Sequence, residues 1–334
     1  MKPAAILPWL QPHWQTLMTA HQQKRLPHAL LLGGQRGLGK TQLAEQLVYA
    51  LLCQDVRPDG SVCGHCRGCH LLSAGHHPDF IRLNPLENSQ NILIDQVRGL
   101  IQFCTLTSHY GGYQIALIEP AEAMNQNAAN GLLKLLEEPP DNTLLILVSH
   151  RPMQLLATIR SRCQRFDLGR VNQTEINTWL QAQLEPEQDI DLLLKLTLNA
   201  PLAALVLAQG EDMKIRRAVF NDIDGLIQGK IDPVKTAQQW SQYNINYLLY
   251  WLITWLMDVI RFSSTAQKQW LVNHDQLSRI EFFSQQLDLK KSFELLELLG
   301  EHYRLFNSTA NIKPQSLLEV VTMTFVETTL PLRK

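Results

Sequence analysis

Residues 29–52 read ALLLGGQRGLGKTQLAEQLVYALL, and this stretch decides the fold. It begins with a short apolar run, continues into a glycine-rich loop, and ends in a segment whose apolar residues recur with the period of a helix. Residues 34–41 match the pattern G-x-x-x-x-G-K-[ST], which is typical of a loop that surrounds phosphate groups. A glycine-rich turn could match this pattern by chance, but the strand-loop-helix context favours a true P-loop.

Each residue type in this loop has a role in phosphate chemistry. Gly34, Gly37 and Gly39 let the backbone bend so that its N–H groups face a phosphate. Lys40 is expected to reach the β- and γ-phosphates, and Thr41 to offer its hydroxyl to Mg²⁺. The loop therefore predicts binding of ATP with Mg²⁺.

Hydrolysis of a bound nucleotide needs further carboxylates at the end of a neighbouring strand. The apolar run 115–118 is followed by Glu119, Pro120, Ala121 and Glu122. Glu119 can hold the metal, but a proline cannot orient an attacking water. Glu122 is three residues further on, and a catalytic group displaced by ~1 Å can cost ~10²-fold in rate. The sequence therefore predicts nucleotide binding without efficient turnover.

Four of the six cysteines form the pattern C-x9-C-x2-C-x2-C, with glycines between them. Four thiolates at this spacing can close a tetrahedral Zn²⁺ site, which leaves no open position for water and predicts a structural metal. An iron–sulfur cluster is the chemical rival, but the x3-C-P element is missing. His65 and His70 are expected bystanders that could substitute as ligands, and Cys104 and Cys163 are expected to be ordinary buried side chains. The predicted ligands are Cys53, Cys63, Cys66 and Cys69.

The remaining pattern divides the chain into an α/β half and a helical half. Compact apolar runs predict buried parallel strands at 29–32, 115–118 and 144–148, with helices at 41–52 and 127–136. After about residue 166 the strand signals fade. Helices are predicted at 173–184, 190–198, 246–262, 279–287 and 292–306. The helix 246–262 is apolar around most of its circumference, which fits an ordinary bundle core and a subunit interface equally well.

Composition and charge argue against a secreted protein and a membrane protein. The 334 residues carry 30 Lys+Arg against 31 Asp+Glu, so the net charge of −1 creates no general field that attracts nucleic acid or a membrane. Pro8 and Pro12 interrupt the apolar start, unlike a secretory signal. The apolar stretch 247–260 is shorter than the ~20 residues of a membrane span and contains Asp258. We expect a cytoplasmic protein with no membrane partner.

A helix-like stretch from residue 155 to 160 leads into Ser161, Arg162 and Cys163. Judged by the residues alone, Arg160 and Arg162 simply complement the negative end of a helix.

Four motifs together change this interpretation. The P-loop, the cysteine cluster, LLKLLEEPP at 132–140 and SRC at 161–163 occur in the order found in bacterial AAA+ clamp-loader subunits, which the chain resembles over about residues 28–166. The resemblance implies a RecA-type AAA+ domain, a small helical lid and an all-α collar. It also implies that Arg162 enters a neighbouring subunit's ATP site in trans, as an arginine finger on the γ-phosphate.

Two departures indicate which kind of subunit this chain resembles. The motor subunit of the family carries Asp-Glu where this chain has Glu119-Pro120, and a sensor arginine where this chain has 199–202, NAPL. The absence of both features is similar to the partner subunit of the family, which does not hydrolyse ATP itself. The intact P-loop is instead similar to the motor subunit, because some of these partner subunits have a degraded loop. The resemblance thus implies weak or absent ATPase activity in a subunit of a DNA-directed DNA polymerase holoenzyme.

The expected organisation is an AAA+ domain at 1–167 with a zinc loop at 53–69, a lid at 168–209 and a collar at 210–334. The resemblance implies partnership with gamma/tau-type motor subunits, a delta-type subunit, the beta sliding clamp and the backbone of primed DNA. Two alternatives stay open. Robust steady-state turnover by the isolated chain would indicate an autonomous AAA+ ATPase, and duplex binding without partners would indicate a zinc-dependent DNA-binding module with a vestigial nucleotide fold.

Overall fold

The computed structural model describes residues 5–57, 60–87, 89–169, 171–286, 289–306 and 313–329. The last residue of the predicted helix 279–287 and both ends of the predicted domain organisation lie outside these residues. Two compact units are present: Met1–Gln183 with Ala200–Ala203, and Leu184–Asn199 with Ala204–Lys334. The predicted lid therefore does not coincide with either unit, and the three-domain organisation stays a prediction.

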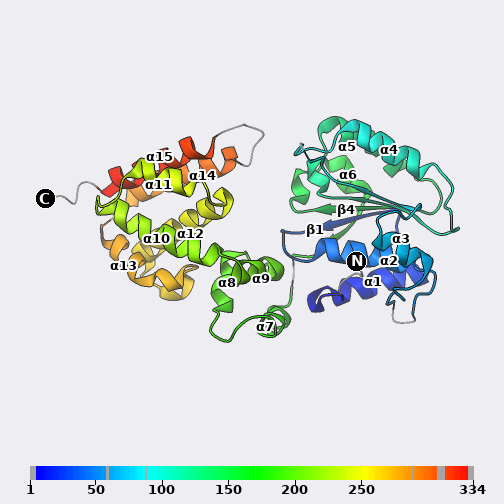
Figure 1. Cartoon of the computed structure of the whole chain (residues 1–334), viewed down its shortest axis with the longest axis horizontal. Helices are drawn as coiled ribbons and strands as arrows, with labels where there is room; N and C mark the ends of the chain where they lie inside the picture. The colour runs from blue at the N-terminus through cyan, green and yellow to red at the C-terminus, as the bar shows by residue number, and fades with distance from the viewer. Residues whose placement is uncertain are drawn as a thin grey trace. The chain divides into compact units, whose positions relative to one another are not determined.

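The first unit is built on a five-stranded parallel sheet, as the α/β class predicts (Figure 1). The strand order is β2-β3-β4-β1-β5. Adjacent strands are in parallel register, with Leu31 opposite Leu147 on one side and Arg165 on the other. The strands are β1 Ala29–Gly33, β2 Phe80–Leu83, β3 Gln114–Ile118, β4 Thr143–Ser149 and β5 Gln164–Asp167.

Helices cover both faces of this sheet, so the inner strands are buried throughout and mostly apolar (Figure 1). Helices α4, α5 and α6 lie on one face, and α1, α2 and α3 lie on the other. The helices of this unit are α1 Gln11–Gln22, α2 Lys40–Leu52, α3 Arg67–Ser73, α4 Ile94–Cys104, α5 Gln126–Glu137, α6 Ala157–Arg162 and α7 Gln173–Gln181. Single-turn 3-10 helices are η1 Pro8–Leu10, η2 Ala121–Ala123 and η3 Pro152–Gln154.

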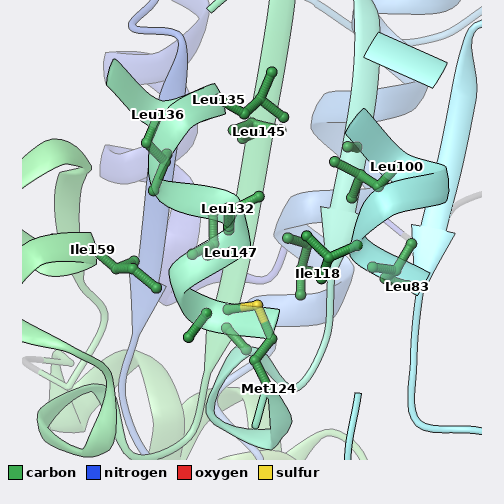
Figure 2. Close-up of a cluster of buried hydrophobic side chains, with 14 of the residues drawn as sticks. Leu83, Leu100, Ile118, Met124, Leu132, Leu135, Leu136, Leu145, Leu147 and Ile159 are labelled. Carbon is green, nitrogen blue, oxygen red and sulfur yellow. The ribbon is translucent and has the colours of Figure 1, made fainter. Parts of the chain in front are cut away.

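A hydrophobic core lies between the sheet and helices α4, α5 and α6. It fixes the positions of α5, which carries LLKLLEEPP, and of α6, which leads into SRC. Figure 2 shows Leu145 and Leu147 of β4 next to Leu135 and Leu132 of α5, and Leu136 belongs to the same cluster. Ile159 of α6 is fully buried in the same cluster. Truncating one such leucine to alanine typically costs about 2 to 5 kcal/mol of stability, so α5 and α6 are firmly attached to the sheet.

The second unit is helical in its described residues. Its helices are α8 Ile190–Leu196, α9 Pro201–Gln209 (apart from its first residues), α10 Asp212–Ile227, α11 Pro233–Trp240, α12 Ile245–Thr265, α13 Leu277–Gln286, α14 Leu289–Phe306 and α15 Pro314–Thr329, with 3-10 turns η4 Lys268–Trp270 and η5 His274–Gln276. Trp251 and Trp255 of α12 are buried, and the Trp255 ring meets Phe283 edge to face at 5.0 Å between ring centres. Most apolar side chains of α12 are thus used within the unit's own core.

Asp258 is the charge inside the apolar stretch of α12, and it is fully buried. Its Oδ2 accepts hydrogen bonds from the Asn273 backbone N–H at 2.7 Å and side-chain Nδ2 at 2.9 Å, and its Oδ1 pairs with Arg261 at 2.8 Å. The carboxylate therefore has partners that compensate for burial. Among the described residues no single helix is long and apolar enough to cross a membrane, and α8 with α9 reaches that threshold only when the two are counted together.

Candidate functional site

The predicted P-loop connects β1 to α2 at the carboxyl end of the sheet. Gly34, Gly37 and Gly39 have φ values of 141°, 87° and 87°, which favour glycine. A Cβ atom on Gly37 would lie 2.8 Å from the Cβ of Ala203. Because α2 begins at Lys40, its first backbone N–H groups are available to a phosphate at this end of the helix.

The segment Ala200–Ala203 lies against this loop within the first unit. The Leu202 backbone N–H donates a hydrogen bond to the Gly37 carbonyl oxygen at 3.0 Å. This is the stretch in which the sequence carries no arginine. Apolar side chains, those of Ala200 and Ala203, therefore lie next to the P-loop at this segment.

Lys40 is almost completely buried, at 2% exposure. Its Nζ donates a hydrogen bond to the Gln35 carbonyl oxygen at 2.6 Å. Burial lowers the pKa of its ammonium group to about 8, although the charges of Glu122 and Glu119 act in the opposite direction. The lysine still carries its charge at pH 7, as a phosphate-binding lysine requires.

Thr41 at the start of α2 lies beside Glu119, which directly follows β3. The Thr41 hydroxyl donates a hydrogen bond to Glu119 Oε1. Arg82 on β2 contacts Glu119 Oε2 at 3.3 Å and Glu45 Oε1 on α2 at 2.6 Å. A hydroxyl oxygen beside a carboxylate is a donor set that suits Mg²⁺, with Arg82 as a competing cation.

Glu122 is closer to the P-loop than its position in the sequence indicated. It lies on the turn η2, and its Oε1 accepts a hydrogen bond from the His150 backbone N–H at 2.9 Å. Its Oε2 and the His150 Nδ1 are buried with no hydrogen-bond partner among the described residues. Glu122 also affects the Lys40 pKa more strongly than Glu119 does.

His150 also lies at this site, although no sequence motif indicates it. It directly follows β4, so it lies at the same carboxyl edge as the P-loop. Burial lowers the pKa of its imidazole, and the positive charge of Lys40 acts in the same direction. The ring is therefore neutral at pH 7. The only sequence signal was its place immediately after a buried strand.

The four predicted zinc ligands form one cluster, with all four sulfur atoms within 4.8 Å of one another. The Sγ–Sγ distances are 3.6 Å for Cys53–Cys63, 3.9 Å for Cys53–Cys66 and 4.0 Å for Cys63–Cys69. A tetrahedral zinc site with Zn–S bonds of about 2.3 Å has sulfur atoms about 3.8 Å apart. The spacing and the donor set therefore fit zinc.

The surroundings of the cluster favour the thiolate at Cys66, whereas burial raises the pKa of the Cys53 and Cys69 thiols. Burial raises the pKa of the Cys66 thiol, but hydrogen bonds from the backbone N–H groups of Cys69 and Gln54 outweigh it and lower the pKa to about 6. Asp55 and His65 also lie within ligand distance of Cys63, so His65 is near enough to act as a substitute.

Arg162 lies elsewhere. It is the last residue of α6, which leads directly into β5, so it is at the amino edge of the sheet and the P-loop is at the carboxyl edge. Its side chain is 34% exposed, and its Nη2 lies 2.6 Å from Glu137 Oε1. Arg162 is therefore separated from the P-loop of its own chain by the length of the strands.

Two parts of the chain match families of DNA polymerase III subunits. Residues 10–172 match the family described as "DNA polymerase III, delta subunit", and residues 210–324 match "DNA polymerase III, delta subunit, C terminal". The chain is similar to DNA polymerase III subunit delta' of Pseudomonas aeruginosa, at 36% identity over 95% of this chain and 96% of that protein.

Two further relatives show how much of the chain is similar to each kind of subunit. The chain is 35% identical to DNA polymerase III subunit delta' of Escherichia coli over 76% of both chains. It is 32% identical to DNA polymerase III subunit tau of Bacillus subtilis over 52% of this chain and 30% of that protein. The similarity to delta' extends over most of the chain, whereas the similarity to tau covers about half of it.

Proposed function

Because the chain belongs to the family of DNA polymerase III delta' subunits, we propose that it completes the clamp loader of that polymerase and acts there through Arg162. The process in which it acts is DNA replication. The proposed partners are gamma/tau-type motor subunits and a delta-type subunit, and through them the beta sliding clamp. Contact with primed DNA would be to the backbone, because the net charge of −1 leaves only local basic groups.

The position of Arg162 carries this proposal. The arginine is partly exposed at the amino edge of the sheet, and the five-residue strand β1 separates that edge from the P-loop by about 16 Å. A guanidinium placed there lies at the opposite edge of the sheet from the chain's own P-loop and is accessible to a neighbour. In the neighbouring site it would stabilise the charge that develops on the γ-phosphate.

The chain's own pocket is proposed to bind ATP with Mg²⁺ and to turn it over slowly. Gly34, Gly37, Gly39, Lys40 and Thr41 would hold the phosphates and Glu119 the metal. The residue after Glu119 is a proline, which has no group to activate water.

The cysteine cluster is proposed to hold one structural Zn²⁺. Four protein sulfur ligands leave no open position, so the metal would stabilise the loop 53–69 and take no part in a reaction. The AAA+ region at 1–167, lid at 168–209 and collar at 210–334 are the organisation proposed for the assembled subunit.

Omission of this chain tests the proposed function. A loader reconstituted from the motor and delta-type subunits alone should place labelled beta clamp on primed DNA at a rate at least ~10-fold lower than the complete complex. The reason is that the neighbouring ATP site lacks its arginine. The measurement is the rate of clamp loading with and without the chain. Equal rates would contradict a role in the loader.

Lys40→Ala tests the nucleotide pocket. Loss of a buried ammonium that contacts phosphates should lower the affinity of the isolated chain for MgATP by about 30-fold. A fluorescent ATP analogue can report the dissociation constant, with the exposed Lys134→Ala as the matched control. If the unmodified chain already shows no saturable binding, the loop holds no nucleotide and this part of the proposal is wrong.

A further inference from the structure

The guanidinium of Arg162 is already held in place within the subunit. Its Nη2 lies 2.6 Å from Glu137 Oε1, and its Nη1 donates a hydrogen bond to the Thr158 carbonyl oxygen at 3.0 Å. We propose that Glu137 is a positioning residue, whose carboxylate orients Arg162 toward the neighbouring subunit's ATP. This inference rests on the proposed function of Arg162 and adds a second residue to it.

The backbone positions of both residues are fixed by the core. Glu137 is the last residue of α5 and Arg162 is the last residue of α6. Their neighbours Leu136 and Ile159 are 2% and 0% exposed and belong to one hydrophobic cluster (Figure 2). The two charged side chains therefore meet because two buried helices end side by side, and a loop movement is not needed to bring them together.

The ion pair is poorly suited to stabilising the fold. The side chains of Arg162 and Glu137 are 34% and 49% exposed, and ion pairs with this much exposure contribute little to stability because water screens them. Its larger effect is on the freedom of the arginine. A free arginine side chain samples many rotamers, and ordering it before it meets a phosphate reduces the entropy lost on contact.

The geometry leaves the guanidinium able to bind a second anion. Arginine has five N–H groups, and the contacts to Glu137, to the Thr158 carbonyl and to the Ser161 hydroxyl at 3.5 Å use at most three of them. The remaining N–H groups can contact a phosphate oxygen while Glu137 keeps its hold. Glu137 thus orients the arginine without occupying it completely.

The neighbouring residue provides a matched control. Glu138 carries the same side chain one position later, beyond the end of α5, and it is exposed. Replacing either glutamate by glutamine removes one negative charge from the same part of the surface. Only Glu137→Gln removes the charge that contacts Arg162.

The test uses the complete loader reconstituted with each variant of this chain. Glu137→Gln should lower the kcat of clamp- and DNA-stimulated ATP hydrolysis about fivefold, with the KM for ATP unchanged, and Glu138→Gln should leave both constants unchanged. The kcat of Glu137→Asp, which keeps the charge on a shorter side chain, should lie between those of Glu137→Gln and Glu138→Gln. In the Arg162→Ala background, Glu137→Gln should cause no further loss, because the residue it positions is gone.

Each outcome has a separate meaning. If Arg162→Ala leaves the rate unchanged, the proposed function itself fails. If Arg162→Ala lowers the rate but Glu137→Gln behaves like Glu138→Gln, only the positioning role is refuted. If Glu137→Gln lowers the rate equally in the Arg162→Ala background, Glu137 has a merely structural role. If Glu137→Gln raises the rate, its carboxylate keeps the arginine away from the phosphate. Either result would overturn this inference.

Discussion

Replacing Arg162 with alanine should lower the clamp-stimulated ATP turnover of the reconstituted loader by about 10³-fold, while the complex still assembles. The loss is large because an arginine finger contacts charge that exists mainly in the transition state. Assembly should persist because the exposed Arg162 side chain is not part of the buried core. Turnover is measured at saturating ATP, and assembly by size-exclusion chromatography.

Two control variants make this result specific. Arg98→Ala removes another exposed arginine from the same unit, one that pairs with Asp95 at 2.8 Å, and should have no effect on turnover. Arg162→Lys keeps the charge but loses the planar fork, so it should restore only a small part of the activity. An unchanged rate for Arg162→Ala would remove this residue from the mechanism.

Removal of the metal should have the second largest effect. The purified chain should contain about one equivalent of zinc, and Cys69→Ser should release it and destabilise the first unit by about 3 to 5 kcal/mol. The reason is that Cys69, at 3% exposure, joins α3 to a loop held by three other sulfur atoms. Metal analysis and thermal unfolding are the measurements.

Cys104→Ser is the matched control for the metal. Cys104 is fully buried but is not one of the clustered cysteines, so this variant should lose some stability and keep its zinc. Iron with visible absorption in the purified chain would favour the iron–sulfur alternative. Full zinc content in Cys69→Ser would show that another ligand set, for example one that includes His65, holds the ion.

The inner part of the sheet was predictable and its edges were not. The strands β1, β3 and β4 each contain a continuous apolar run because both of their faces are buried, and the sequence predicts all three. The strands β2 and β5 were missed. Each carries exposed polar side chains, such as Arg82 and Gln164, because an edge strand is only half covered.

The P-loop could be located from sequence because its chemistry is contiguous along the chain. Glu122 and His150 could not, because their proximity depends on the turn η2 and on the carboxyl ends of β3 and β4 meeting at one edge of the sheet. Likewise, the sequence predicts that the helix before SRC ends at residue 160, but α6 continues through Arg162. The contact with Glu137 follows from that additional half-turn and from the packing of α5.

The most direct measurement is an electron cryo-microscopy structure of the assembled loader with a non-hydrolysable ATP analogue in the motor subunits. We predict that a guanidinium nitrogen of Arg162 lies about 3 Å from a γ-phosphate oxygen in the adjacent subunit. A structure in which Arg162 lies more than about 10 Å from every neighbouring nucleotide, beyond any direct or water-mediated hydrogen bond, would contradict it.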